Sequence, residues 1–298
     1  MNVVQYKTLC IVLHFGSEED TNACLRSLAS EEQLDCVVSD NDPKQSFKPP
    51  ADLVPAVRVI KTGGVAGFSE GNNIAAKAFL SEIHDSLLIL NNDTVVQPGS
   101  TKILRDSLFS GRFGAVGPCM PYADMRDCVW ACGGYIDKLR VRIGGLQPAS
   151  DDPYCVDYLP GAAILCRADL WKALGGLPEK YFFAYEEAEF ALEIKKLGFY
   201  VLANPKAVIL HKVGMSNQKK PMYVYNNVRN RIRFSKYLYG NLFGFIYGLV
   251  LTSITACKRP RRFFLWFVLW AEAIKDECLN NPLNKACLIK IESRYRMD

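Results

Sequence analysis

The tripeptide Asn91-Asn92-Asp93 places three short polar side chains directly after the apolar run at residues 87–90. Four consecutive apolar residues indicate a buried strand. In an open α/β sheet, ligands bind in the crevice at the carboxyl ends of the strands. A carboxylate at such an end, flanked by amides, suits a divalent metal that also holds phosphate oxygens. The alternative is an Asn/Asp turn that only ends the strand.

A second group of residues that could do chemistry is acidic. Glu186, Glu187 and Glu189 follow an aromatic run at 181–185 and open a predicted helix that extends to Gly198. At that position the negative charges meet the positive end of the helix dipole. Capping of the helix would account for any one of these carboxylates. Three of them beside an aromatic cluster, in a chain with a predicted metal site, favour a general base.

A glycine-rich segment at 63–73 and a histidine at a strand end complete the candidate groups. The segment leads into a predicted apolar helix at 74–80. Glycines let the backbone approach a ligand closely, and a helix N-terminus after such a loop favours phosphate. The spacing is not that of a Rossmann site or a P-loop, and a simple connecting loop is the alternative. His211 ends a short predicted strand at 207–210. A neutral imidazole can bind metal, although a lone histidine is more often structural.

The elements that must position these groups are short apolar runs alternating with helical patterns. Such alternation predicts right-handed crossovers and a largely parallel sheet. Three strand ends carry polar clusters, so several loops build the crevice together. Predicted strands cover 8–13, 35–39, 56–60, 87–90 and 207–210, with a strand, a turn and an apolar run at 155–166; predicted helices cover 20–28, 74–80, 167–174 and 186–198; residues 114–147 are predicted to be irregular.

Composition limits the class of protein. The chain has 298 residues, of which 49% are hydrophobic and 22% charged, which is ordinary for a globular protein with a sizeable core. The net charge of +5 permits an anionic substrate or membrane surface, and we expect no nucleic-acid partner. Eleven scattered cysteines and an N-terminus without a secretory cleavage pattern indicate reduced thiols in a cytoplasm.

Together these segments resemble the family 2 glycosyltransferases of the GT-A type, especially the bacterial rhamnosyltransferase-like members that build cell-surface polysaccharide. The matching pieces occur in the family's order over roughly residues 8–216, and the segment YNNVRNR beyond them also fits. The resemblance implies a mixed, mainly parallel α/β sheet flanked by helices in a catalytic domain at 1–218. A C-terminal helical region would occupy 219–298. The pieces are LCIVLHF, VVSDN, GFSEGNN, LLILNNDTVVQPG, YLPGAAILCRADLWKALGGLPEKYFFAYEEAEFALEIKKLGF and AVILHKVGMS.

The resemblance also implies roles for individual residues. Asp93 ends the triplet that stands where the family carries its metal-binding D-x-D, and His211 matches the histidine that often completes that site, so Mg²⁺ or Mn²⁺ is implied. Glu187 matches the general base. Asp40 matches the residue that contacts the nucleotide base. The residues that match the family's other positions are Gly67, Asn72, Asn91 and Asn92 for the nucleotide sugar, and Gly161, Ala162 and Glu186 for the donor sugar and acceptor.

The implied activity is inverting, metal-dependent transfer of a sugar from a nucleoside diphosphate to a glycan or lipid-linked acceptor. Two alternatives stay open. A nucleotidyltransferase would need a basic, glycine-rich signature directly after the first strand, where residues 14–20 are instead acidic. A non-catalytic nucleotide-sugar-binding protein is the other alternative, because Glu187 stands where the family usually carries aspartate.

The C-terminal tail contains two apolar runs, 242–256 and 263–271, on either side of the basic cluster KRPRR at 258–262. Neither run reaches the roughly 20 residues that a membrane-spanning helix needs. Apolar segments rich in aromatics around a basic cluster suit the surface of an anionic membrane. We therefore expect peripheral contact with the cytoplasmic face of the cell membrane. The alternative is two helices that pack on the catalytic domain or form a homodimer.

Overall fold

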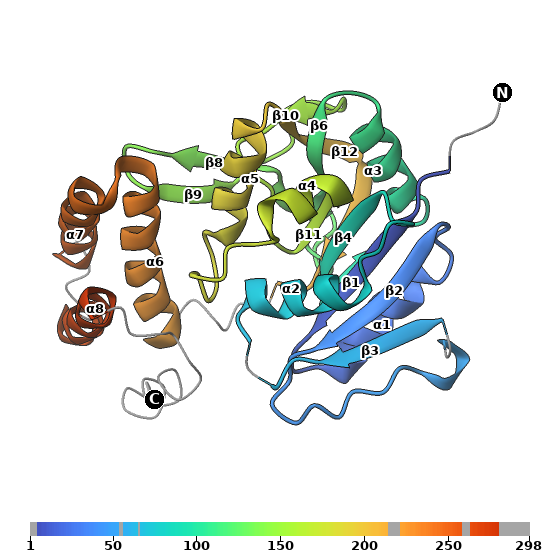
Figure 1. Ribbon diagram of the computed structural model, residues 1–298, viewed down its shortest axis with the longest axis horizontal. Coiled ribbons are helices and arrows are strands. Elements are labelled where there is room, and N and C mark those ends of the chain that lie inside the picture. Colours follow the sequence, from blue (N-terminus) through green and yellow to red (C-terminus); the bar gives the residue numbers. More distant parts are fainter. Residues whose placement is uncertain (1–4, 54–55, 65, 214–220, 258–262, 280–298) are drawn as a thin grey trace. The chain divides into compact units, whose positions relative to one another are not determined.

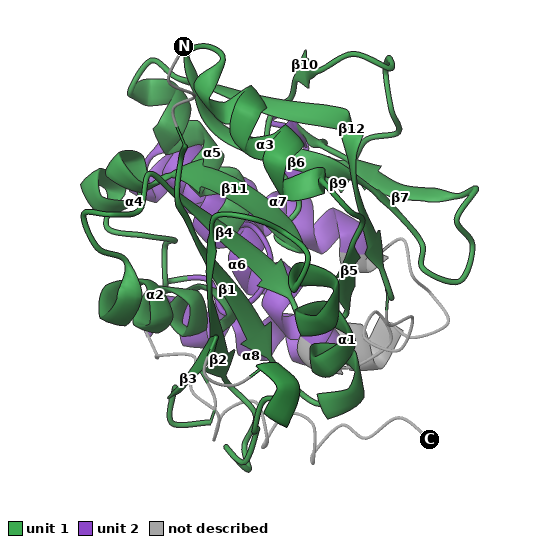
Figure 2. Ribbon diagram, turned by 90° about the vertical axis from the view of Figure 1, so that its right-hand side faces the viewer, with its two compact units in different colours: residues 1–135, 144–180, 186–213 green, residues 136–143, 181–185, 214–298 purple. Residues whose placement is uncertain are grey.

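A computed structural model of the chain describes residues 5–53, 56–64, 66–213, 221–257 and 263–279 (Figure 1). The chain forms two compact units, which Figure 2 distinguishes by colour. The sheet unit contains Met1–Tyr135, Gly144–Lys180 and Glu186–Val213, and the helical unit contains Ile136–Ile143, Tyr181–Tyr185 and Gly214–Asp298. The predicted boundary between residues 218 and 219 lies outside the described residues, and the division at that point stays a prediction.

A mixed sheet forms the centre of the sheet unit. Its strands are β1 (Thr8–His14), β2 (Leu34–Asp40), β3 (Val57–Lys61), β4 (Ser86–Asn91), β5 (Thr94–Val96), β6 (Phe113–Pro121), β7 (Val129–Cys132), β10 (Tyr154–Cys155), β11 (Ala163–Arg167) and β12 (Tyr200–His211). Their order is β10-β12-β6-β11-β4-β1-β2-β3, with β5 paired to β12 and β7 to β6. Strands β3, β2, β1 and β4 are parallel, and β11 runs antiparallel between β4 and β6. The predicted mainly parallel sheet is confirmed.

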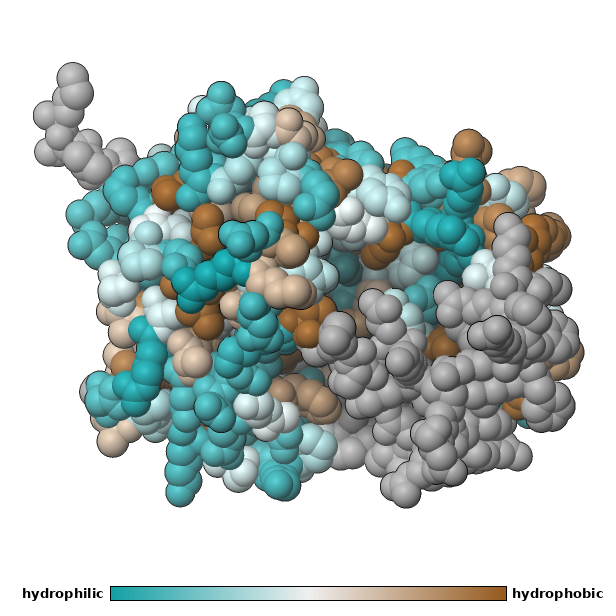
Figure 3. All heavy atoms as spheres, turned by 180° about the vertical axis from the view of Figure 1, so that it is seen from behind, coloured by the Kyte–Doolittle hydropathy of each residue, from teal (hydrophilic) through white to brown (hydrophobic). Residues whose placement is uncertain are grey.

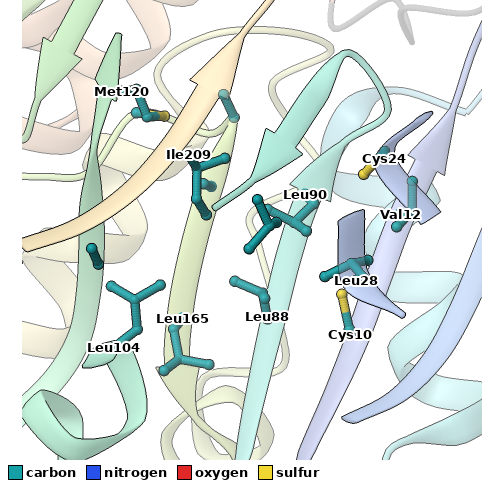
Figure 4. Close-up of a cluster of buried hydrophobic side chains, with 14 of the residues drawn as sticks. Cys10, Val12, Cys24, Leu28, Leu88, Leu90, Leu104, Met120, Leu165 and Ile209 are labelled. Atoms are coloured by element: carbon teal, nitrogen blue, oxygen red, sulfur yellow. The ribbon is translucent and has the colours of Figure 1, made fainter. Parts of the chain in front are cut away.

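Helices cover both faces of this sheet. They are α1 (Glu18–Leu28), α2 (Phe68–Phe79), α3 (Ser100–Phe109), α4 (Ala168–Leu174) and α5 (Glu186–Lys196). Val12 and Leu90 point into a core shared with α1 and α3, where they lie near Leu28 (Figure 4). Leu13 points to the opposite face of the sheet, toward α2. The Cδ1 atom of Leu13 is so close to Gly71 of α2 that a Cβ added to this glycine would lie 2.7 Å from it. Figure 2 shows α2, α4 and α5 together on that opposite side.

Helix α2 begins earlier than the sequence pattern predicts. The predicted span was 74–80, whereas the observed helix starts at Phe68, inside the glycine-rich segment. Ser69, Gly71 and Asn72 are buried in its first turns. These small residues therefore allow the helix to pack closely and do not form a loop. The predicted start was wrong because the whole glycine-rich stretch up to residue 73 was predicted to be a loop before the helix.

The stretch 114–147 is not irregular as predicted, because it contains the buried strand β6. A Cβ on Gly114 would lie 2.5 Å from Cγ2 of Ile194, and one on Gly117 would lie 2.5 Å from Cδ2 of Leu159. The glycines of β6 are therefore required by neighbouring side chains and do not form turns. Two further strands of this stretch, β8 (Gly134–Asp137) and β9 (Arg142–Gly145), form a separate two-stranded sheet.

Gly114→Ala should destabilise the protein by about 1–3 kcal/mol, the usual cost of overpacking a core. The new methyl would meet Ile194, which is fully buried, and Cδ1 of Leu170 at 2.8 Å. Urea unfolding measures the loss. Ile194→Leu removes the Cγ2 methyl, so Gly114→Ala should cost less in that background. An equal cost in both backgrounds would contradict this account of β6.

The helical unit is built around α6 (Pro221–Tyr239), with α7 (Asn241–Cys257) and α8 (Phe263–Cys278) packed on it. Ile232 of α6 and Leu269 and Ala273 of α8 share a buried apolar cluster. Glu277 is buried in the same unit, and Arg233 and Lys236 bind its carboxylate at 2.6 and 3.1 Å. Within the part of the chain that the structure describes, no helix combines the length and hydrophobicity needed to cross a membrane.

Candidate functional site

The strand directions bring several of the predicted site residues to one edge of the sheet. Asp40 and Asn91 end the parallel strands β2 and β4, so they lie at the same edge. Strand β11 is antiparallel to β4, so Ala162, which precedes it, returns to that edge. Strand β12 is parallel to β6, and β6 is antiparallel to β11, so β12 runs in the same direction as β4. His211 at the end of β12 therefore also lies at this edge. Several loops therefore share one edge of the sheet, the edge at which open α/β sheets bind ligands.

Asp93 and His211 face one another at this edge. Oδ1 of Asp93 lies 3.3 Å from Nε2 of His211, whose side chain is 7% exposed. Strand β5 fixes the pair, because Thr94 is the register partner of His211 and Lys212 donates its backbone N–H to the Asp93 carbonyl at 2.9 Å. The Trp130 ring packs edge-on against the imidazole at 4.5 Å.

The chemistry of this pair fits a divalent cation. Among the described residues, neither Oδ1 of Asp93 nor Nδ1 of His211 has a hydrogen-bond partner. A carboxylate oxygen and an imidazole nitrogen are both common ligands of first-row divalent metals. No group of three His, Cys, Asp or Glu side chains that could hold a metal occurs in the described ranges. The remaining ligands of such an ion must therefore include groups other than these side chains, such as phosphate oxygens or water.

The two asparagines before Asp93 connect neighbouring loops. The Asn92 amide donates to Oγ1 of Thr21 at 2.9 Å and to two backbone carbonyls of the β1–α1 loop. The Asn91 backbone N–H donates to the carbonyl of Ala162 at 3.0 Å. The triplet thus forms a turn, as the alternative hypothesis held, and it also ties the β4 end to two loops at the same edge of the sheet.

The end of β2 shapes the glycine-rich loop. Asp40 is fully buried, and its two carboxylate oxygens accept the backbone N–H groups of Asp42 and Phe47 at 3.2 and 3.1 Å. Asn41 donates to the carbonyl of Ala66 at 2.7 Å and accepts its N–H at 2.9 Å. Sequence reasoning did not single out Asn41, although an amide at a strand end was an available signal. The predicted contact between Asp40 and a nucleotide base stays a prediction.

The start of α2 lies beside the loop before β11. Gly67 is the N-cap residue of α2, and Asn72 is buried with its Nδ2 donating to the Phe68 carbonyl at 2.9 Å. A Cβ on Gly161 would lie 3.0 Å from Cζ of the Phe68 ring. Gly161 therefore permits the close approach of these two segments, and the structure brings the predicted donor and acceptor loops together.

The acidic residues occupy the first turn of α5, as predicted. Glu186 is the first residue of the helix and is almost fully buried, and Glu187 is the next. Glu189 forms an ion pair with Nζ of Lys180 at 2.7 Å. The helix ends at Lys196, two residues before the predicted limit. The assignment of Glu187 as the base stays a prediction.

His14 at the end of β1 is a residue that sequence reasoning missed. Its Nδ1 lies 2.6 Å from Oγ1 of Thr21, and its ring packs on Phe47 at 4.7 Å. Burial lowers the pKa of His14, and the opposing influence of the Asp40 and Asp42 carboxylates does not offset it. The lowered pKa favours the neutral imidazole at this edge of the sheet. Its place at a strand end was the same signal that identified His211.

The fold is that of the GT-A glycosyltransferases. The structure is similar to a mannosyltransferase from Pyrobaculum calidifontis, solved in complex with GDP-Man and Mn²⁺, with a TM-score of 0.57 and 10% identity over 93% of this chain and 88% of that one. The model of the glycosyltransferase like family 2 matches residues 35–233, which is more than half of the chain. The chain belongs to this family and is a glycosyltransferase, so the predicted class and family are confirmed.

Two curated relatives cover most of the chain. An N-acetylglucosaminyl-diphospho-decaprenol L-rhamnosyltransferase of Mycobacterium tuberculosis is 25% identical over 223 residues, which are 65% of this chain and 72% of that protein. The low-salt glycan biosynthesis hexosyltransferase Agl10 of Haloferax volcanii is 22% identical over 241 residues, which are 77% of this chain and 75% of that protein. Both relatives transfer sugars, according to their names.

Proposed function

We propose that this protein is an inverting, metal-dependent glycosyltransferase that moves a sugar from a nucleoside diphosphate to a glycan or lipid-linked acceptor in cell-surface polysaccharide synthesis. The observation that carries the proposal is the opposed pair Asp93 and His211 at the edge where the predicted donor loops converge. The names of the two relatives, one acting on a decaprenol-linked sugar and one in glycan biosynthesis, support the acceptor class.

The donor half of the site is built from the edge loops. Oδ1 of Asp93 and Nε2 of His211 would hold Mg²⁺ or Mn²⁺, which when bound neutralises the charge of the departing diphosphate. Gly67 has no side chain to cap the first N–H groups of α2, and such a helix start favours a phosphate group. Asn41 keeps the adjoining loop in place by pairing with both backbone groups of Ala66. These residues bind and orient the donor.

The acceptor half depends on the first turn of α5. Glu187 takes the proton of an acceptor hydroxyl, and that oxygen attacks the anomeric carbon from the face opposite the diphosphate. The bond from the anomeric carbon to the diphosphate breaks as the new bond forms, so one displacement inverts the configuration. A positioned general base contributes about 10²–10⁴-fold, and orientation of the two substrates contributes further.

Release of nucleoside diphosphate from a panel of UDP-, dTDP- and GDP-sugars, with Mn²⁺ and with or without a polyprenyl-diphosphate sugar acceptor, tests this function. We expect one donor to be consumed faster when the acceptor is present. Binding of a donor without consumption, in either condition, would favour the non-catalytic alternative. No stabilisation of the protein by any donor would contradict the proposal as a whole.

A second part of the proposal concerns helix α7, which has two apolar faces. Phe245 and Leu249 pack against the core of the helical unit. The opposite face is an exposed apolar stripe, and Figure 3 shows brown hydrophobic side chains on the surface of the molecule. The stripe consists of Leu242, Phe243, Ile246, Val250 and Ile254, which are 76%, 62%, 52%, 50% and 47% exposed.

We propose that the apolar stripe docks on the cytoplasmic face of an anionic membrane, where a lipid-linked acceptor would be found. The basic cluster at 258–262 directly follows α7 in the sequence and lies outside the described residues. Basic residues near an anionic surface contribute about 1 kcal/mol each and are screened by salt. Apolar side chains on one helix face add shallow insertion. A homodimer formed through the same stripe is the alternative.

The protein should sediment with vesicles that contain anionic lipid at low salt, and less at high salt or with neutral vesicles. Ile246→Asp should weaken this binding at least about 10-fold, because it places a charge in the middle of the stripe. Leu197→Asp is the matched control, since Leu197 is 46% exposed in the sheet unit, and it should bind like the unchanged protein. A protein that stays in the supernatant with both vesicle types, and sediments as a dimer, would show that the stripe joins two copies.

A further inference from the structure

The segment that leads into α5 has an unusual backbone. Ala184 and Tyr185 both adopt left-handed conformations, with φ of 71° and 79°. Side chains with a Cβ rarely occupy this region, because the Cβ approaches the following carbonyl oxygen. Two such residues in succession persist only where the surrounding structure holds them. Tyr185 is bonded to Glu186, the first residue of α5, so this turn directly precedes the helix in the chain.

The side chain of Asn230 on α6 holds the turn. Its Nδ2 donates one hydrogen bond to the carbonyl of Phe183 at 2.7 Å and one to the carbonyl of Ala184 at 3.0 Å. Asn230 is fully buried, so water does not compete for these bonds. Both N–H groups of the amide are used, and both acceptors belong to the turn. Asn230 thus fixes the orientation of two consecutive peptide groups.

Tyr185 provides a second attachment within the helical unit. Its hydroxyl donates to the carbonyl of Val141 at 3.2 Å, and its ring packs on Phe234 of α6 at 5.2 Å. Its side chain is only 4% exposed. The turn is therefore held by its backbone at Asn230 and by its side chain at Phe234, four residues further along the same helix.

We propose that Asn230 is a positioning residue for the general base Glu187, an inference that rests on the proposed function. Asn230 touches neither substrate in this account. It acts through the turn, because a change in the peptide orientation at 183–185 rotates the first turn of α5 and moves the Glu187 carboxylate. A displacement of about 1 Å at a reacting group can cost on the order of 10²-fold in rate, so a partial shift gives a measurable loss.

Asn230→Leu keeps the size of the side chain and removes both donors. With the donor sugar of the panel that the unchanged protein consumes fastest, we expect kcat to fall about 10-fold and the KM for that donor to stay within about twofold. Adding Ala184→Gly should restore part of kcat, because glycine adopts the left-handed conformation without cost. Asn226→Leu is the matched control. It removes an equally buried amide one helical turn away, for which the structure gives no bond to the turn, and its kcat should not change.

Amide hydrogen exchange of the segment 183–187 gives a readout that does not depend on activity. Exchange should be at least about 10-fold faster in Asn230→Leu and unchanged in Asn226→Leu, with both variants folded by thermal melting. Unchanged exchange in Asn230→Leu overturns the proposal. Faster exchange with unchanged kcat also overturns it, because the turn would then not position the base. If the unchanged protein consumes no donor, or Glu187→Gln is fully active, the proposed function fails, and the positioning role that rests on it fails with it, whatever the exchange shows.

Discussion

Glu187→Gln should bind the donor as the unchanged protein does and should lose sugar transfer by at least about 10²-fold. Glutamine has the shape of glutamate and keeps a hydrogen-bonding group, but it cannot accept the proton of an acceptor hydroxyl. The lower end of the contribution of general base catalysis is about 10²-fold, which sets the expected loss. Thermal shift with UDP or dTDP and Mn²⁺ measures donor binding, and release of the nucleoside diphosphate in the presence of acceptor measures transfer.

Glu189→Gln is the matched control for this prediction, because it lies in the same first turn of α5. Its carboxylate binds Lys180 at 2.7 Å, so the substitution should lower stability more than it lowers transfer. A control that loses transfer while Glu187→Gln stays active would mean that the alignment of the acidic residues with the family motif is wrong. Loss of donor binding in Glu187→Gln would instead place this residue on the donor side.

The sheet was largely predictable because its central strands are continuous apolar runs. Strands β1 and β4 are buried on both faces, as is the second half of β2, and each was predicted to within about two residues of its observed ends. Strand β6 is also buried, but its glycines led to the prediction of an irregular segment. Gly114 and Gly117 are explained by side chains that are distant in the sequence, among them those of Ile194 and Leu159. No local pattern contains that information.

In the site, too, some residues follow from local sequence patterns and others depend on contacts with residues distant in the sequence. Asp93 and His211 were predictable separately, since each ends an apolar run, and parallel and antiparallel pairing then brings them to one edge. Asn41 and Asn230 act through hydrogen bonds to backbone groups of remote loops. The sequence around them resembles that of an ordinary turn and an ordinary helix. Left-handed backbone at Ala184 could not be predicted either, because alanine has no preference for it.

Asp93→Ala should abolish the Mn²⁺-dependent binding of UDP or dTDP. The substitution removes Oδ1, the atom that lies 3.3 Å from Nε2 of His211 and has no hydrogen-bond partner among the described residues. A single imidazole would then remain as the protein's ligand. It is neutral, so it supplies no negative charge to hold a doubly charged cation. A ligand present at 100 times its Kd stabilises a folded protein by about 2.7 kcal/mol, so the loss is visible as a missing thermal shift.

Two further variants test whether the Mn²⁺-dependent thermal shift depends on the pair Asp93 and His211. His211→Ala should weaken the Mn²⁺-dependent shift without removing it, because the charged ligand Asp93 remains. Asp20→Ala removes another carboxylate, one that binds Nζ of Lys212 at 2.6 Å, and should leave the shift unchanged. Nucleotide binding that is equally strong with EDTA, or equally strong in Asp93→Ala, would contradict the metal site. The donor would then have to be held by the amides and helix N-terminus of the edge loops alone, and a residue other than Asp93 would have to balance the charge of the leaving diphosphate.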